Sequence, residues 1–296
     1  MRLATLGCSA GLAVAALWGF LAQPRLAAQD QPLPDLDVLV AKARAHVRSD
    51  RDLLSQYTYL ERRADIHLSA LAKVATGPLK VYQVYPGADG IQTYRRLIEV
   101  DGMPVPQIEL DKQDRDRRRE VLDALARREH ESPRDREKRL ARREKLRADE
   151  QQAIDELFQL YTFAIVGRES IDGHPAIAVD FVPKPNIVPR TDEGKLMKKV
   201  KGRVWVSEAD YEVARVQAEM LDDVSVMGFL GKLYKGTTAS FERRKVNNEI
   251  WLPARARFDG SGRALIRKFR IDTVVEYSDY RKFSVETDTT FAIPKQ

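Results

Sequence analysis

The stretch GRVWVSEADYEVARVQAEM, residues 202–220, contains two short apolar runs joined by a polar turn at Ser207 to Asp210. In the second run, residues on alternate positions share a character, and the apolar set is Ala214, Val216, Ala218 and Met220. Alternation with a period of two is typical of a strand that has one apolar face. The stretch therefore predicts a β-hairpin whose apolar face covers either an ordinary core or a hydrophobic ligand.

Further hairpin signals surround this stretch. Apolar runs flank Asp101-Gly102, Asp172-Gly173 and Asn247-Asn248, and a fourth turn is expected over Asp259 to Gly262. Pairs of this kind favour the backbone of tight hairpin turns. Strands and helices do not alternate along the chain, which argues against a parallel sheet. We expect a many-stranded antiparallel sheet.

Helices are expected in two regions. Apolar residues near helical spacing predict an amphipathic helix over roughly 35–54. Residues 111–150 hold 15 basic and 12 acidic residues with few apolar ones, and Pro133 divides them. This composition forms helices that bury little surface. We read 111–155 as a charged helical hairpin inserted between strands, either a solvated insertion or an arm that contacts a membrane surface or an envelope protein.

The segment VSVMGFLGKLYKG breaks the pattern of strands. Val226, Phe229, Leu230 and Leu233 lie at i, i+3, i+4 and i+7. Such spacing usually indicates a core-facing helix. The segment is interpreted either as a mobile apolar flap over a cavity or as a plug helix or irregular strand within the core.

Residues 1–28 have the layout of a secretory signal peptide. Arg2 precedes a long apolar run, and Ala28 ends a small-residue exit. The run is also about long enough for a retained membrane anchor, which is the alternative. Residues 29–34 then form a linker to a single domain over 35–290. Cleavage would remove Cys8, the only cysteine, and lower the net charge from +6 to +4. We expect a periplasmic or cell-envelope protein without disulfides, and no nucleic-acid partner despite the pI near 9.3.

Signatures of catalysis and of metal binding are missing from the sequence. The 4 histidines show no ligand spacing, and no nucleophile elbow, phosphate loop or dinucleotide fingerprint occurs. We expect no cofactor, no metal and no enzymatic activity, with a hydrolase built from dispersed residues as the alternative.

Three segments resemble the outer-membrane lipoprotein-sorting superfamily, which includes the LolA and LolB carriers and the sensor domain of RseB. They are residues 202–220 with a Trp-bearing strand and an acidic turn, residues 236–258 with a Gly-Thr entry and "WLP", and YSDYRKF at 277–283. The resemblance covers about 35–110 and 155–285. It implies an α+β fold in which a strongly curved antiparallel sheet, an incomplete barrel, wraps around helices. It also implies that acyl chains bind between the sheet and the helices.

The resulting hypothesis is a periplasmic protein that binds or carries acyl chains of lipids or lipoproteins. The residues expected to line or gate its hydrophobic groove are Trp205, Phe229, Leu230, Leu233 and Trp251. The alternatives are an envelope sensor or protein-interaction module with the same fold, and the hydrolase named above.

Overall fold

The computed structural model describes residues 31–47, 53–68, 74–87, 92–226 and 231–282. The chain divides into two units, Met1–Pro32 and Leu33–Gln296, and the second holds every element below. The predicted signal peptide, with Cys8, lies outside the described residues. None of the described helices has the length and apolar character needed to cross a membrane.

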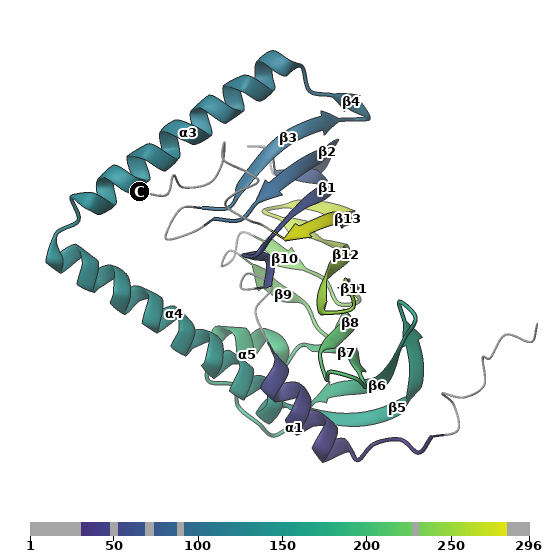
Figure 1. The fold of residues 1–296 in the computed structure, drawn as a ribbon. Helices are drawn as coiled ribbons and strands as arrows, with labels where there is room; N and C mark the ends of the chain where they lie inside the picture. Colours follow the sequence, from purple (N-terminus) through teal and green to yellow (C-terminus); the bar gives the residue numbers. More distant parts are fainter. Residues whose placement is uncertain (1–30, 48–52, 69–73, 88–91, 227–230, 283–296) are drawn as a thin grey trace, which may run out of the picture. The chain divides into compact units, whose positions relative to one another are not determined.

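One antiparallel sheet organises the second unit, with thirteen strands in the described residues. Its main path runs β4-β3-β2-β1-β13-β12-β11-β8-β7-β6-β5, and the short β10 and β9 branch from β12 (Figure 1). The two strands at the ends of this path, β4 and β5, do not pair with each other, so the sheet is not closed. The strands are β1 (Tyr57–Leu68), β2 (Val74–Tyr85), β3 (Tyr94–Val100), β4 (Met103–Pro104), β5 (Tyr161–Ile171), β6 (His174–Pro183), β7 (Val200–Ser207), β8 (Val213–Met220), β9 (Val224–Val226), β10 (Gly231–Leu233), β11 (Thr238–Val246), β12 (Ile250–Ala264) and β13 (Arg267–Lys282). The predicted α+β class and open antiparallel sheet are confirmed.

The predicted hairpin at 202–220 is β7 and β8, with Val204 paired to Val216. The register shifts between Trp205 and Val206, so the alternation is not strict. As a result Ala214 packs in the same cluster as Trp205, on one face of the sheet. Val216 lies with Val204 on the other face. The prediction that Ala214 and Val216 share one apolar face is therefore wrong, because a β-bulge lies between them.

Three of the predicted turns are present. Asp101, Asp172 and Asn247 each have a positive φ and are followed by a second residue with positive φ. The fourth, at Asp259 to Gly262, is wrong because β12 continues to Ala264 and turns at Leu265. At Gly262 an added Cβ would lie 2.2 Å from the carbonyl oxygen of Lys232 on β10. Glycine at this position permits the close approach of a neighbouring strand instead of making a turn.

The helices in the described residues are α1 (Leu36–His46), α3 (Gln107–Glu129), α4 (Pro133–Leu160) and α5 (Asp192–Met197). The first ends before the predicted 54, since Val47 is already extended; residues 48–52 lie outside the described part, and Leu53 and Leu54 are helical. Ser132 caps α4 and Pro133 occupies its first turn, where a missing N–H costs nothing. Residues 224–226 and 231–233 form a strand pair, which agrees with the predicted strand alternative and not with the plug helix. Phe229 and Leu230 lie outside the described residues.

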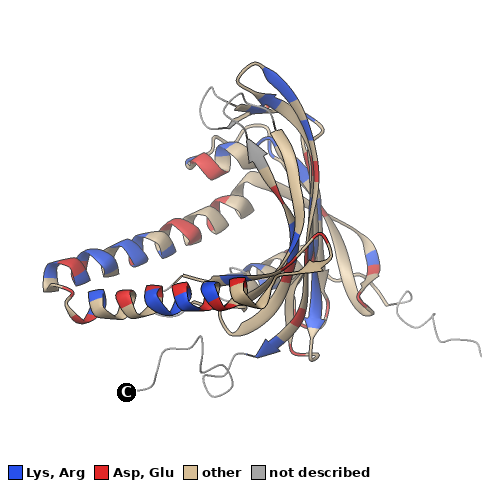
Figure 2. Cartoon of the chain, turned by 90° about the horizontal axis from the view of Figure 1, so that it is seen from above, with Lys and Arg blue, Asp and Glu red and all other residues tan. Residues whose placement is uncertain are grey.

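The charged helices α3 and α4 follow each other between β4 and β5, and both signs of charge run along them (Figure 2). Polar contacts hold α3 at β3. The Gln113 amide accepts from the Leu97 N–H and donates to the Leu97 carbonyl, and Asp114 accepts two hydrogen bonds from Arg96. Because Gln113 hydrogen-bonds the backbone N–H and carbonyl of Leu97 near the sheet edge, these groups cannot pair with another strand.

Three buried clusters form the core. Leu39 and Ala43 of α1 pack on Ile177, Val179 and Val206. A second cluster holds Trp205 and Trp251 with Ile171 and small residues of β6 and β8. A third joins Leu53, Tyr57 and Leu252. The first cluster lies directly beside the cavity described next.

Candidate functional site

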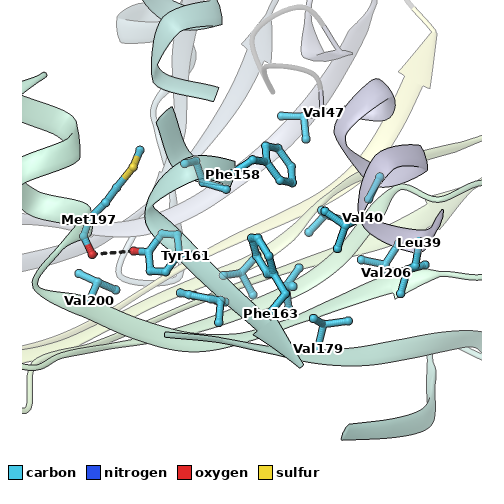
Figure 3. A pocket seen from close by; sticks show the side chains of 16 residues that line it. Leu39, Val40, Val47, Phe158, Tyr161, Phe163, Val179, Met197, Val200 and Val206 are labelled. Atoms are coloured by element: carbon cyan, nitrogen blue, oxygen red, sulfur yellow. Dashed lines mark hydrogen bonds between the residues drawn. The ribbon is translucent and has the colours of Figure 1, made fainter. Parts of the chain in front are cut away.

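An apolar cavity of about 360 Å³ lies between the sheet and three helices. Side chains from α1, the end of α4, α5 and strands β5 to β8 surround it (Figure 3). Its sixteen lining residues are Leu39, Val40, Ala43, Val47, Leu157, Phe158, Tyr161, Phe163, Val179, Phe181, Met197, Val200, Val204, Val206, Val213 and Val216. No carboxylate, imidazole or ammonium group is among them.

The repeat of the helix and the alternation of the strand explain why these side chains face the cavity. On α1, Leu39 and Ala43 are four residues apart and therefore lie on one face of the helix. On β6, Val179 and Phe181 alternate with Asp180, which forms an ion pair with Arg203 on the opposite face. The cavity wall is thus the apolar face of four strands, covered by apolar side chains of α1, α4 and α5.

The single side-chain oxygen or nitrogen among the lining residues belongs to Tyr161. Its hydroxyl donates a 2.7 Å hydrogen bond to the backbone carbonyl of Met197 (Figure 3). Burial raises the pKa of Tyr161 to about 12, so the phenol stays neutral at physiological pH. With this hydroxyl satisfied, the wall offers a ligand contacts to hydrocarbon only.

The wall between α4 and α5 is fixed by Glu156, which is 6% exposed. Its carboxylate accepts hydrogen bonds from the Thr191 hydroxyl and the Arg190 N–H, and from the Thr191 N–H at 3.2 Å. The hydrogen bond from the Thr191 side chain, followed by that from the Arg190 backbone, lowers the pKa of Glu156 below its ordinary value of 4.5. Glu156 thereby holds Leu157 and Phe158 of α4 against α5, which carries Met197.

Replacing Glu156 with Gln is expected to lower the free energy of unfolding by about 1–3 kcal/mol at pH 7, since an amide cannot accept from every donor around it. Because the folded-state pKa is lowered, the carboxylate contributes stability above pH 4.5 that is lost as the pH falls through the folded pKa. Urea unfolding at several pH values measures this difference, which should shrink in acid. Glu150→Gln, at an exposed position of the same helix, is the control. Equal losses in both variants, or a loss that does not change with pH, would contradict this role.

The apolar surface continues beyond the cavity. Val216 lines the cavity and also an open trough of about 350 Å³, whose apolar residues include Phe241, Ala256, Phe258 and Val275. Val200 likewise belongs both to the cavity and to a wider depression of about 660 Å³ beside α5. A ligand longer than the cavity therefore has an apolar path across the sheet.

The two tryptophans predicted to line the groove do not line this cavity. Trp205 alternates with Val204 and Val206, so it lies on the face of β7 opposite the cavity, where Arg203 and Arg215 flank its ring. Trp251 is 0% exposed in the cluster that also contains Trp205, and its Nε1 donates to Asp210. Neither lines the cavity.

Of the other predicted residues, Leu233 lines the wide depression beside α5 together with Leu196 and Met220. Phe229 and Leu230 lie outside the described residues. The sequence reasoning missed the residues that do line the cavity, above all Phe158, Phe163 and Phe181. Phe163 and Phe181 were detectable as alternating apolar positions in predicted strands.

No family model matches the chain, and no curated protein matches it. Solved structures do show similarity. A LolA superfamily protein from Nitrosomonas europaea has 11% sequence identity and a TM-score of 0.27, over 88% of this chain and 99% of that chain. An outer membrane lipoprotein-sorting protein domain from Vibrio parahaemolyticus has 10% identity and a TM-score of 0.29, over 86% and 94%. MucB from the MucA/MucB complex of Pseudomonas aeruginosa has 8% identity and a TM-score of 0.21, over 82% and 93%.

Proposed function

We propose that this protein binds a lipid or lipoprotein acyl chain in the periplasm or cell envelope and acts as a non-enzymatic binding or carrier protein. The observation that carries the proposal is the apolar cavity, in which the one polar side-chain atom, the Tyr161 hydroxyl, is already hydrogen-bonded. The predicted signal peptide supports export.

The size of the cavity suits part of a hydrocarbon chain. An apolar cavity of about 150 Å³ stays dry and accepts benzene, and the cavity here has about 360 Å³. Each methylene transferred from water into it contributes about 0.8 kcal/mol. A long acyl chain that continues into the open trough therefore gains enough to offset the entropy lost on association.

The lining argues against hydrolysis in this cavity. General acid–base and nucleophilic catalysis need a titratable or activated group within hydrogen-bond distance of the reacting atoms. The lining offers only the Tyr161 phenol, which burial keeps protonated. Among the described residues, no group of three or more His, Cys, Asp or Glu side chains is arranged to hold a metal.

Native mass spectrometry tests the proposal. Protein purified without detergent from its own cell envelope is expected to carry one additional mass that matches a lipid or free acyl chain. Delipidated protein should regain that mass when mixed with envelope lipid extract. A clean apo mass in both samples would contradict acyl-chain binding.

A further inference from the structure

The apolar row that begins at the cavity ends at a charged side chain. Val216 on β8 faces Phe241 on β11, and Phe241 faces Ala256 on β12. Ala256 in turn faces Val275 on β13, whose partner on β1 is Arg63. Directly paired residues of neighbouring strands project to the same side of a sheet. Arg63 is therefore the end of an uninterrupted cross-strand row that starts at the cavity wall.

The length of this row matches that of a long acyl chain. Neighbouring strands are about 4.8 Å apart, so the four steps from Val216 to Arg63 span roughly 19 Å. The strands between them, β11, β12 and β13, carry the apolar residues of the open trough. An extended chain with its end in the cavity would place its other end near β1.

Arg63 belongs to a cluster built around a buried carboxylate. Glu61 is 2% exposed, and Arg63 and Arg95 each approach it to 3.2 Å. We call Glu61, Arg63 and Arg95 the arginine patch. A buried carboxylate requires such partners, because a single unpaired charge there would be costly. Here two guanidinium groups share one carboxylate.

The arginine patch carries an excess of positive charge after its neighbours are included. Asp65 lies 3.5 Å from Arg63 and 2.8 Å from Lys80. The five side chains therefore comprise three cations and two carboxylates. The arginine side chains are 36% and 41% exposed, so both remain accessible. Arg95 uses its Nε on Glu61, which leaves its terminal NH₂ groups for a further acceptor.

Two tyrosines lie beside the arginine patch. The ring of Tyr82 lies 5.5 Å from the Arg63 guanidinium. Burial raises the pKa of the nearby Tyr59 to about 12, so its phenol adds no negative charge at neutral pH. The neutral phenol of Tyr59 leaves the excess charge of the arginines uncompensated.

We infer that the arginine patch binds the anionic head of a single-chain amphiphile whose tail occupies the trough and the cavity. The chemistry recognised is a carboxylate or phosphate group, whose oxygens match the planar fork of a guanidinium. This inference rests on the proposed acyl-chain binding and adds to it the polarity and orientation of the ligand: the head lies at β1 to β3, and the tail lies under α1.

Three ligands with the same tail test the inference: hexadecanoate, hexadecanol and hexadecylamine, each below its micellar concentration at pH 8. Displacement of the neutral dye Nile red reports their affinities. Hexadecanoate is expected to bind about tenfold more tightly than hexadecanol, as suits charge-assisted hydrogen bonds, and hexadecylamine most weakly. Added salt should reduce the preference.

Variants of the arginine patch test whether it causes the preference for hexadecanoate. In the double variant Arg63→Gln/Arg95→Gln, hexadecanoate should bind no more tightly than hexadecanol. In Arg95→Gln alone, the difference between the two affinities should shrink. The affinity for hexadecanol should be unchanged in both variants. Arg203→Gln, on the opposite face of the sheet, is the matched control and should keep the preference. Arg95→Gln alone keeps the ion pair between Arg63 and Glu61. This variant therefore still measures the preference for the acid if the double variant does not fold.

The outcomes separate the two proposals. If none of the three ligands binds, acyl-chain binding itself fails. If hexadecanol binds as tightly as hexadecanoate, or if Arg203→Gln abolishes the preference as fully as the patch variants, the cavity proposal stands and the head-group inference is overturned.

Discussion

Replacement of Val40 with Trp is expected to weaken acyl-chain binding roughly a hundredfold, since the larger side chain excludes about four methylenes at about 0.8 kcal/mol each. Val40 lies on α1 and lines the cavity (Figure 3). The indole would occupy space that a ligand otherwise fills. Titration with labelled hexadecanoate measures the affinity, and circular dichroism shows whether the fold is kept.

The matched control is Val38→Trp. Val38 is on the same helix but 51% exposed, outside the cavity lining. This substitution makes the same change in side-chain size and in helix propensity, so it should leave the affinity within a factor of two or so, as surface changes usually do. Equal affinities of the two variants would mean that the ligand does not enter the cavity.

Replacement of Trp251 with Ala is expected to lower the free energy of unfolding by about 3–5 kcal/mol, the usual loss for a buried large aromatic side chain. Trp251 is 0% exposed and donates a hydrogen bond to Asp210, whose carboxylate also accepts from Lys245 at 2.7 Å. The indole therefore ties the turn between β7 and β8 to β12, and Lys245 ties the same turn to β11. Equilibrium unfolding in urea measures the change.

Trp251→Phe separates structure from binding. It keeps most of the ring and loses the hydrogen bond to Asp210, so we expect a smaller loss of about 1–3 kcal/mol. Acyl-chain affinity should be unchanged, because Trp251 does not line the cavity. A Phe variant with normal stability and lost binding would restore the role in the ligand groove that the sequence suggests.

Much of the sheet was predictable because its turns depend on local chemistry. Asp101-Gly102 and Asp172-Gly173 have the positive φ values that such pairs favour, and their hairpins were predicted. Asp259 to Gly262 misled because glycine has two uses in β structure. Here Gly262 accommodates the backbone of β10, a contact between residues far apart in sequence.

The cavity was less predictable because its walls come from distant parts of the chain. Period-two patterns show which residues of one strand share a face, but they do not show which face the helices cover. Trp205 was predicted to line the groove, yet the helices cover the opposite face of β7, which carries Val204 and Val206. The contribution of α4 depends on the contact of Glu156 with Thr191, which no local pattern reveals.

The most direct test of the central claim is a crystal structure of the protein with ω-bromohexadecanoate, whose bromine is located by anomalous scattering. We predict a bromine peak inside the cavity, between Leu39 of α1, Phe158 of α4 and Val179 of β6. A bound ligand whose bromine lies at any other surface, with the cavity unoccupied, would contradict acyl-chain binding between the sheet and the helices.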